Sequence, residues 1–181
     1  MTKLTQEYVR QLLDYDPETG ELRWKVRKGG RKVGVGVAAG TTKSTESTGY
    51  LSITINRKSF LTHRLIWLWV YGYFPENQID HINRIRSDNR LSNLREVSQT
   101  CNNRNCGMNH RNKSGVKGIS WSIRYGKWWS CITTTNKTKH LGRFEDFTEA
   151  VAHRLAAEQC LDWAGCDSSS SAYQYMNSIR R

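Results

Sequence analysis

The sequence predicts an α+β fold built from two consecutive parts. Short runs of alternating apolar and polar residues, typical of strands, occur beside runs with apolar residues three or four apart, typical of helices. The polar and basic stretch at 105–114 resembles a linker and separates these runs into two groups. We therefore expect domains at 1–110 and 111–166, followed by a loose, serine-rich tail at 167–181.

The first part is expected to contain two helices and several strands ahead of its central block. In chain order these are a helix at 5–13, a strand at 21–26, a hairpin at 49–61 and a buried helix at 62–73. Thr5 can cap the first helix, and Gly72 with Pro75 ends the buried one. The stretch 25–40 is basic and rich in glycine, which predicts a mobile loop that could follow a DNA groove.

The central block is expected to be strand, loop, strand and helix, and the second part three strands and a helix. The central elements lie at 79–82, 94–98 and 99–105, within a motif at 78–105. The three later strands are expected at 115–121, 127–135 and 137–144, with turns at 125–126 and 136. Thr148 is expected to cap a last helix that runs to about residue 163.

Composition favours a polyanionic partner. Lys and Arg number 28 against 16 Asp and Glu, so the net charge is +12. That surplus is typical of proteins that bind nucleic acid, and by itself also fits an anionic membrane surface. No apolar run approaches the roughly 20 residues that span a bilayer, and the first residues lack a signal-peptide core. We therefore expect a protein of the cytoplasm, in a bacterium or a phage-infected cell.

Five cysteines give an odd count at irregular spacing, which argues against a disulfide framework. Cys101 and Cys106 are close enough to raise the question of zinc. No second Cys/His pair follows at finger spacing, so structural zinc is not expected.

Asp80 and His81 place a carboxylate next to an imidazole at the start of a stretch rich in arginine and asparagine. Phosphodiester hydrolysis needs a base for water near neutral pH and positive charge on the phosphate. A histidine suits the first task, and a divalent cation held by oxygen ligands suits the second. On a strand the two side chains point to opposite faces, so both can serve one phosphate only where the strand ends.

At these residues the chain resembles the HNH endonucleases of the ββα-metal fold, in the branch found among phage homing endonucleases. The motif is DH at 80–81, DNR at 88–90, NLR at 93–95 and Asn102, preceded by THRLIW at 62–67. The resemblance implies that His81 is the general base and that Asn93 orients it through a hydrogen bond. It implies one divalent ion, Mg²⁺ first and Mn²⁺ second, held by Asp80 and Asn102. From the residues alone, Asn89 is expected to be a turn residue and His63 a buried helix histidine.

A second resemblance covers about residues 112–164. The segments NKSGVKGISW at 112–121, GKW at 126–128 and KHLGRF at 139–144 are similar to the AP-two/ERF DNA-binding domain. That family lays a three-stranded sheet in the major groove, which is wide enough for β elements. Ser120 and Ser122 stand where plant members have arginines, so plant-type base reading is not expected. The expected DNA contacts are Arg84, Arg86, Arg90, Arg95, Lys117, Arg124, Lys127, Trp128, Lys137 and Lys139.

The sequence thus predicts a metal-dependent endonuclease that hydrolyses double-stranded DNA to 3′-hydroxyl and 5′-phosphate ends. One active site cuts one strand per encounter, so a monomer should nick, and a double-strand break would need a dimer. The alternatives are a DNA-binding regulator with a decayed nuclease fold and an RNA-directed protein. The sequence leaves open the target site and whether the role is homing, packaging, restriction or repair.

Overall fold

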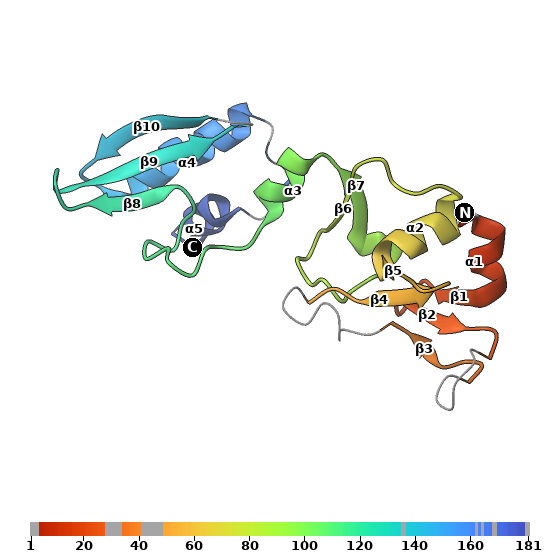
Figure 1. Ribbon diagram of the computed structural model, residues 1–181. Helices are drawn as coiled ribbons and strands as arrows, with labels where there is room; N and C mark the ends of the chain where they lie inside the picture. The colour runs from red at the N-terminus through yellow and green to blue at the C-terminus, as the bar shows by residue number, and fades with distance from the viewer. Residues whose placement is uncertain are drawn as a thin grey trace. The chain divides into compact units, whose positions relative to one another are not determined.

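The computed structural model describes residues 4–27, 34–40, 49–134, 137–161, 163, 165–167 and 170–179. These residues form helices and antiparallel sheets, the predicted α+β class (Figure 1). The chain divides into two compact units, Met1–Ser98 and Gln99–Arg181. The boundary lies earlier than the predicted 110/111, because helix α3 (Gln99–Asn105) is cross-linked to C-terminal residues.

The first unit follows the predicted order and adds two short strands. Its elements are α1 (Gln6–Leu12), β1 (Leu13–Asp16), β2 (Glu21–Trp24), β3 (Ala38–Ala39), β4 (Ser52–Ile55), β5 (Lys58–Leu61), α2 (Thr62–Tyr71), β6 (Gln78–His81), the short 3₁₀ helix η1 (Leu91–Asn93) and β7 (Leu94–Val97). Thr5 caps α1 by accepting a bond from the Tyr8 N–H, and α2 ends at Gly72 in the left-handed region, both as predicted. Strands β1 and β3 were not predicted.

The described part of this unit contains three small antiparallel sheets, and α2 packs against β5 of one of them. The sheets are β1-β2-β3, β4-β5 and β6-β7. The β4-β5 hairpin turns at Asn56 and Arg57, which both have positive φ, as a tight hairpin turn requires. Helix α1 packs on α2, and Leu65 and Ile66 of α2 are fully buried in the core. This core fixes the position of β6, the strand that carries Asp80 and His81.

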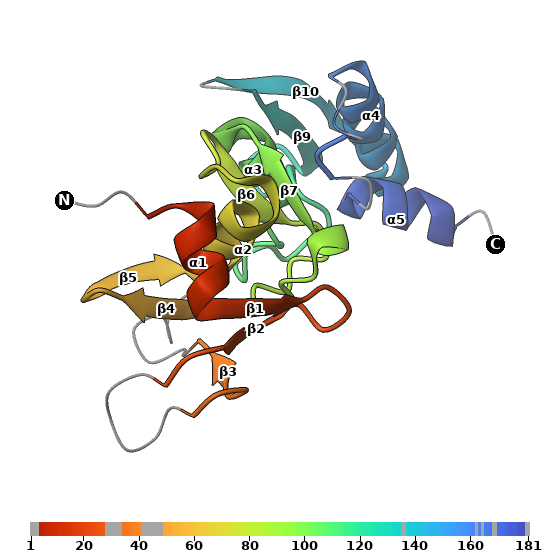
Figure 2. The same ribbon diagram turned by 90° about the vertical axis from the view of Figure 1, so that its right-hand side faces the viewer.

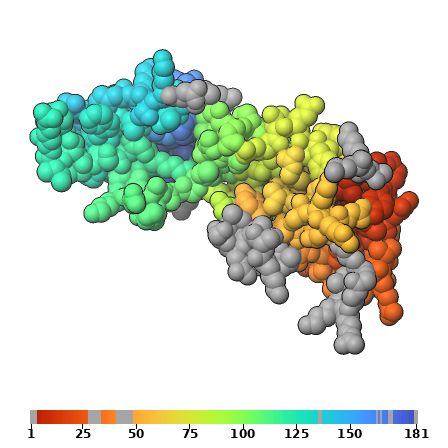
Figure 3. Space-filling view, viewed as in Figure 1, coloured from red at the N-terminus to blue at the C-terminus, as the bar shows by residue number. Residues whose placement is uncertain are grey.

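The second unit is a three-stranded sheet with helices on one face. Its elements are α3, β8 (Ile119–Ser122), β9 (Lys127–Thr133), β10 (Thr138–Phe144), α4 (Phe147–Cys160) and α5 (Ser171–Ser178), with strand order β10-β9-β8. Helix α4 packs on all three strands and α5 packs on α4 (Figure 2). Val116, Ile119, Ala150 and Val151 form the centre of the core between sheet and helix. Figure 3 shows the surface of the same units in the same colours.

Three expectations for this unit need correction. The N-cap of α4 is Asp146, which accepts a bond from the Glu149 N–H, and not Thr148. The expected loose tail contains α5, because Ser170 caps the helix and Ala172 is buried against the core. Cys101 and Cys166 form a disulfide across 65 residues, a pairing that spacing along the chain did not reveal.

Some predictions lie outside the described residues. These are the part of the basic loop at 28–33 and the turn at 136. Among the helices that the structure describes, none combines the length and apolar character needed to cross a bilayer.

Candidate active site

Asp80 and His81 are the last two residues of β6, and both are buried. In the β6-β7 pair Asp80 lies opposite Arg95 and His81 opposite Leu94. The strand ends here as predicted: the Arg84 N–H donates to the His81 carbonyl at 2.9 Å, and Arg84 has a φ of 65°. The chain then turns into a loop at 82–93, which we call the motif loop.

The motif loop is held in shape by Asn93. Its side-chain oxygen accepts from the Asn83 N–H at 2.9 Å, and its side-chain nitrogen donates to the Asp88 carbonyl at 2.8 Å. Asn83 in turn donates to the Asp88 carboxylate at 2.7 Å. One side chain thus fastens both arms of the loop to each other.

The imidazole of His81 is fixed by Asn89, the residue expected to serve only as a turn. The Asn89 side-chain oxygen lies 3.1 Å from His81 Nε2, and Asn89 is 1% exposed. Because the Asn89 amide nitrogen donates to the Ser87 carbonyl, the oxygen is the atom that faces the ring. Nε2 therefore carries the proton and the lone pair lies on Nδ1. The predicted bond from Asn93 to the imidazole is replaced by this one, and Asn93 acts on the loop instead.

Strand β1 and the turn that follows it contact the backbone of the motif loop. The Tyr15 hydroxyl donates to the Asn89 carbonyl at 3.1 Å and accepts from the Leu91 N–H at 2.9 Å. Gly20, with a φ of +75°, is so close that a Cβ atom would overlap the backbone of Asn89 and Arg90. The N-terminal sheet is therefore part of the site, which no motif in the sequence indicated.

Two aromatic side chains border the His81 ring. His63 of α2 lies edge-on at 5.2 Å between ring centroids, and Tyr50 lies at 5.8 Å. The guanidinium of Arg86 stacks over Tyr50 at 5.0 Å. The THRLIW segment at 62–67 contained the signal for His63, while Tyr50 had none.

Burial governs the protonation of both histidines. Desolvation lowers the pKa of His81 below its usual 6.5, and the bond to Asn89 and the charge of Asp80 oppose that shift only in part. Desolvation, the His81 charge and Arg64 lower the pKa of His63 to about 3. Hydrogen bonds from Arg90 hold the pKa of Asp88 well below its usual range. At neutral pH both rings are neutral, and His81 can accept a proton.

Asp80 is the one carboxylate beside His81 on β6. Its Oδ2 accepts from Arg95 Nε at 3.0 Å and from Nη2 at 2.8 Å. A carboxylate is the hard oxygen ligand that divalent ions prefer, and Arg95 would compete with such an ion for Asp80. In the described ranges no three His, Cys, Asp or Glu side chains form a metal cluster, so a ligand set here needs amide or water oxygens. Asn102 lies on α3 in the second unit, and its role as the other ligand stays a prediction.

The four arginines of the motif stretch differ in what they contact. Arg90 pairs with Asp88 at 2.6 Å and is half exposed, while Arg95 pairs with Asp80. Arg86 stacks on Tyr50, and Arg84 occupies the turn after β6. The motif loop thus carries a set of guanidinium groups within a few residues of His81.

In the second unit, two of the expected DNA contacts turn inward. Trp128 packs on Phe147 at 4.6 Å and belongs to the core on the α4 side. Lys117 donates to the carbonyls of Arg104 and Cys106 and lies 3.5 Å from the Asp167 carboxylate. Its ammonium group is therefore a structural clamp and not a phosphate contact.

The face of the sheet away from α4 carries aromatic and cationic side chains that were mostly not among the expected DNA contacts. Register places Trp129 between Ser120 and Arg143 on this face, with the His140 ring 4.2 Å from Trp129. Arg143 stacks on Tyr125 at 3.8 Å and on Trp129 at 5.1 Å. We call this set, with Lys127, the outer face.

Lys139 lies opposite Ile132, on the α4 side, and Arg124 stacks on Tyr125 in the β8-β9 turn. Lys137 directly precedes β10, and its carbonyl accepts from the Thr134 N–H.

Comparisons with known proteins place this site in a family. The HNH endonuclease family matches residues 60–104, from the end of β5 to α3, which includes the whole motif loop. Protein 3.8 of Escherichia phage T7 is 34% identical over 91 residues, covering 50% of this chain and 74% of that protein. No solved structure matches the chain. The chain therefore belongs to the family of phage Protein 3.8 and carries an HNH endonuclease domain at residues 60–104.

Proposed function

We propose that the protein is a metal-dependent HNH endonuclease that hydrolyses one phosphodiester bond of duplex DNA per encounter. The observation that carries this proposal is the buried, neutral His81 at the end of β6, held through Nε2 by Asn89 beside the carboxylate of Asp80. A fixed base of lowered pKa and an adjacent acidic ligand are what phosphodiester hydrolysis requires.

In this proposal His81 Nδ1 accepts a proton from the attacking water. The bond from phosphorus to the 3′ oxygen breaks, which gives 3′-hydroxyl and 5′-phosphate ends. The ring needs no change of orientation, because Asn89 and the motif loop already fix its plane. Arg84, Arg86 and Arg90 are positioned to neutralise backbone phosphates near the cut.

Asp80 and Asn102 would hold one divalent ion, with Mg²⁺ favoured and Mn²⁺ second because both ligands are hard oxygens. Such an ion, when bound, supplies positive charge to the phosphate and the leaving oxygen. Arg95 pairs with the Asp80 carboxylate. We propose that Arg95 offsets this buried negative charge and that, beside a bound ion, it would contact the DNA backbone.

The outer face is proposed to hold DNA away from the cut. Trp129, Tyr125 and Arg143 form a stacked aromatic and cationic surface, and Lys127 adds a partly exposed charge. Such surfaces bind the sugar-phosphate backbone and stack on bases. The AP-two/ERF resemblance supports this proposal, and we propose Trp129 in place of Trp128 as the residue that faces the DNA. Arg124, Lys137 and Lys139 remain proposed phosphate contacts of the second unit, although Lys139 lies on the α4 side of the sheet.

One observation favours the alternative of a regulator that binds DNA without cutting it. Arg95 satisfies Asp80 in two hydrogen bonds, which is also how a site that never binds a metal would appear. The two functions differ in a single measurable property, namely cleavage in the presence of a divalent ion.

The deciding experiment is conversion of supercoiled plasmid in Mg²⁺, in Mn²⁺ and in EDTA. We expect nicked circles with either ion and none in EDTA. His81→Ala should lower the rate by about 10²–10⁴-fold, the usual contribution of a general base, and keep salt-sensitive DNA binding. His110→Ala, which removes an exposed histidine of the second unit, is the control and should cut normally. Binding without cleavage at any divalent ion would establish the regulator instead.

A further inference from the structure

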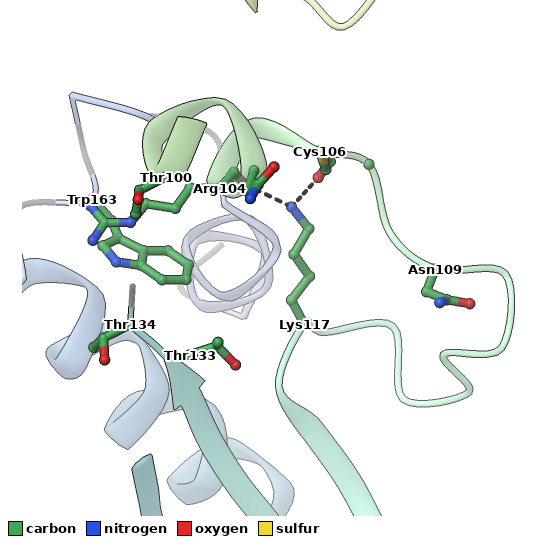
Figure 4. Close-up of a pocket in the computed structure, with 10 residues that line it drawn as sticks. Thr100, Arg104, Cys106, Asn109, Lys117, Thr133, Thr134 and Trp163 are labelled. Carbon is green, nitrogen blue, oxygen red and sulfur yellow. Dashed lines mark hydrogen bonds between the residues drawn. The ribbon is translucent and has the colours of Figure 1, made fainter. Parts of the chain in front are cut away.

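A cavity in the second unit has no role in the site described above. It has a volume of about 370 Å³ and lies between α3, the segment that follows α3 and the end of β9 (Figure 4). The residues used below are Asn103 and Arg104 of α3, Asn109, Lys117 and Trp163. We call it the α3 cavity. Its volume falls in the range of pockets that take small molecules, at roughly 300–1,000 Å³.

Two buried N–H groups in the lining of the cavity have no acceptor. Trp163 is 6% exposed, and its Nε1 bonds to nothing among the described residues. The same holds for Arg104 Nε. A buried donor without a partner costs about 1–3 kcal/mol, and native proteins contain few of them. Both atoms have less than 1 Å² of accessible surface, so an acceptor from outside the chain reaches them only if side chains of the lining shift.

The charge of the cavity favours an anion. No acidic residue lines it, and Lys117 is occupied by two carbonyls and Asp167, as Figure 4 shows for the carbonyls. Arg104 has no ion pair with any described carboxylate, and its Nη1 contacts only the weak acceptor sulfur of Cys166 at 3.8 Å. The guanidinium of Arg104 therefore brings an uncompensated positive charge to the cavity.

Asn103 and Asn109 add amide donors, and the lining also contains the hydroxyls of Thr100, Thr133 and Thr134. The side-chain oxygen of Asn103 accepts from Gln99 at 2.8 Å, and that of Asn109 accepts from the Arg111 N–H at 2.9 Å. Each amide nitrogen is then the group that can bond to a ligand. A lining of guanidinium, indole and amide donors matches a ligand with several acceptor oxygens.

The indole of Trp163 offers its edge and not its face. Arg104 lies over the ring at 5.0 Å and Arg154 at 4.6 Å. A stacked base would compete with these guanidinium groups for the ring, whereas an oxyanion would be attracted by them. The ligand chemistry is thus that of a phosphate and not that of a base.

We propose that the α3 cavity binds the phosphate of a single nucleotide of nucleic acid, with Arg104 Nε and Trp163 Nε1 as its two donors. The size of the cavity allows the attached sugar to enter with the phosphate. This inference rests on the proposed function only in naming DNA as the source of the nucleotide. It gives the second unit a phosphate site on the helix that carries Asn102, separate from the outer face.

The test follows the indole N–H signals of the uniformly ¹⁵N-labelled full chain by NMR, in EDTA so that no cleavage occurs. The chain has seven tryptophans, and Trp163→Phe identifies the signal of residue 163. The probes are dAMP, inorganic phosphate, deoxyadenosine and a 5′-phosphorylated single-stranded oligonucleotide. We expect dAMP and phosphate to move the Trp163 signal downfield in a saturable way, and deoxyadenosine to leave it in place. A shift with deoxyadenosine alone, or no shift with any probe, would overturn the proposal.

Two variants sharpen the test. Arg104→Gln should weaken dAMP binding about tenfold or more, the usual effect of losing a charged hydrogen bond. Arg23→Gln removes the same charge from an exposed pair in the first unit and should bind dAMP as the wild type does. Trp163→Phe should weaken dAMP binding, measured by calorimetry at a temperature where the variant is folded, because it deletes the indole donor; its melting temperature should fall somewhat, since a buried ring that contacts Arg104 and Arg154 becomes smaller. Equal affinity in all variants would contradict the inference.

The outcome is separable from that of the nuclease proposal. His81→Ala should bind dAMP normally while it loses cleavage, and Arg104→Gln should bind dAMP weakly whether or not the protein cuts. The oligonucleotide and dAMP together distinguish a strand end from a free nucleotide as the source of the phosphate.

Discussion

The motif loop and the α3 cavity both contain buried polar side chains, but they differ in whether those side chains have hydrogen-bond partners. In the motif loop, Asn93 bonds through both ends of its amide and Asn89 through its oxygen to His81. In the cavity, Arg104 and Trp163 each keep a donor without an acceptor. A base must be held in one orientation, so its surroundings are internally complete. A binding site must leave donors open, and the protein accepts some loss of stability for that.

The second unit also contains a complete cluster beside the incomplete one. Arg154 Nε donates to Glu158 at 2.7 Å, and the Ser170 hydroxyl donates to the same carboxylate at 2.6 Å. All three residues are buried. This cluster links the segment before α5 to α4. Its Arg154 also lies over the ring of Trp163, one of the two residues with an unpaired donor. Substitutions that remove one hydrogen-bond partner or one close contact at a time test this difference.

The largest effect is expected from Glu158→Ala. It leaves the buried guanidinium of Arg154 without its carboxylate, which usually costs about 3–5 kcal/mol of unfolding free energy. Urea unfolding of the full chain measures this. Glu149→Ala, in the first turn of the same helix, should cost about 1 kcal/mol or less. Equal losses would mean that the Arg154–Glu158 pair contributes no more than a surface charge.

Gly20→Ala should break the closure of the motif loop. The new Cβ would meet the backbone of Asn89 and Arg90, and the position is left-handed. Overpacking and the backbone penalty together predict a loss of roughly 2–4 kcal/mol, with slower cleavage because Asn89 is displaced. Gly36→Ala, at a φ of +81° in open space, isolates the backbone penalty at about 1–2 kcal/mol. A Gly20 variant no less stable than the Gly36 variant would refute the close approach.

Asn89→Ala should lower the cleavage rate about 10–100-fold, the usual effect of losing a group that orients a functional side chain. The imidazole then loses the partner that keeps its proton on Nε2. Asn89→Asp restores an acceptor and adds a charge that raises the pKa of His81, so activity should return with its acid limb at higher pH. Plasmid nicking across pH 5–8 measures both. Wild-type kinetics in Asn89→Ala would leave Asn93 as the orienting residue.

The smallest effect concerns acid sensitivity. The pKa of His63 is about 3 in the folded protein and near 6.5 when unfolded, so the unfolded chain binds more protons between these values. Stability is therefore complete above pH 6.5 and falls as the pH drops, by at most about 1.4 kcal/mol per pH unit for this group. His63→Phe should flatten that slope in urea unfolding between pH 7 and 5, and His110→Ala should not. The lowered pKa of His81 acts in the same direction.

Sequence patterns predicted the elements better than their contacts. The helix at Gln99–Asn105 was predicted to the residue, and the hairpins were placed within a few residues, because periodicity and turn chemistry are local. Asp146 and α5 were missed because caps and short helices depend on which neighbours cover them. The Cys101–Cys166 pairing needed a fold to bring the two cysteines together.

The site was predicted at His81 and Asp80 but not in how they are held. Asn89 and Asn93 are the same residue type four positions apart, and only the path of the motif loop decides which one reaches the imidazole. Trp128 and Trp129 are adjacent on a strand, so one faces α4 and the other the outer face. Because side chains alternate along a strand, the two tryptophans must face opposite sides of the sheet, but the sequence does not say which one faces α4.

The two hydrogen bonds of the Tyr15 hydroxyl, to Asn89 and Leu91, matter for any attempt to move the active site to another protein. The segment that defines the HNH family here begins at residue 60, yet the loop that it contains is braced by a residue 45 positions upstream of that start. Grafting only residues 60–104 onto another scaffold would transfer His81 without the Tyr15 hydroxyl that holds its loop. A transplant that cuts DNA should therefore also include the first hairpin, Leu13–Trp24 in register.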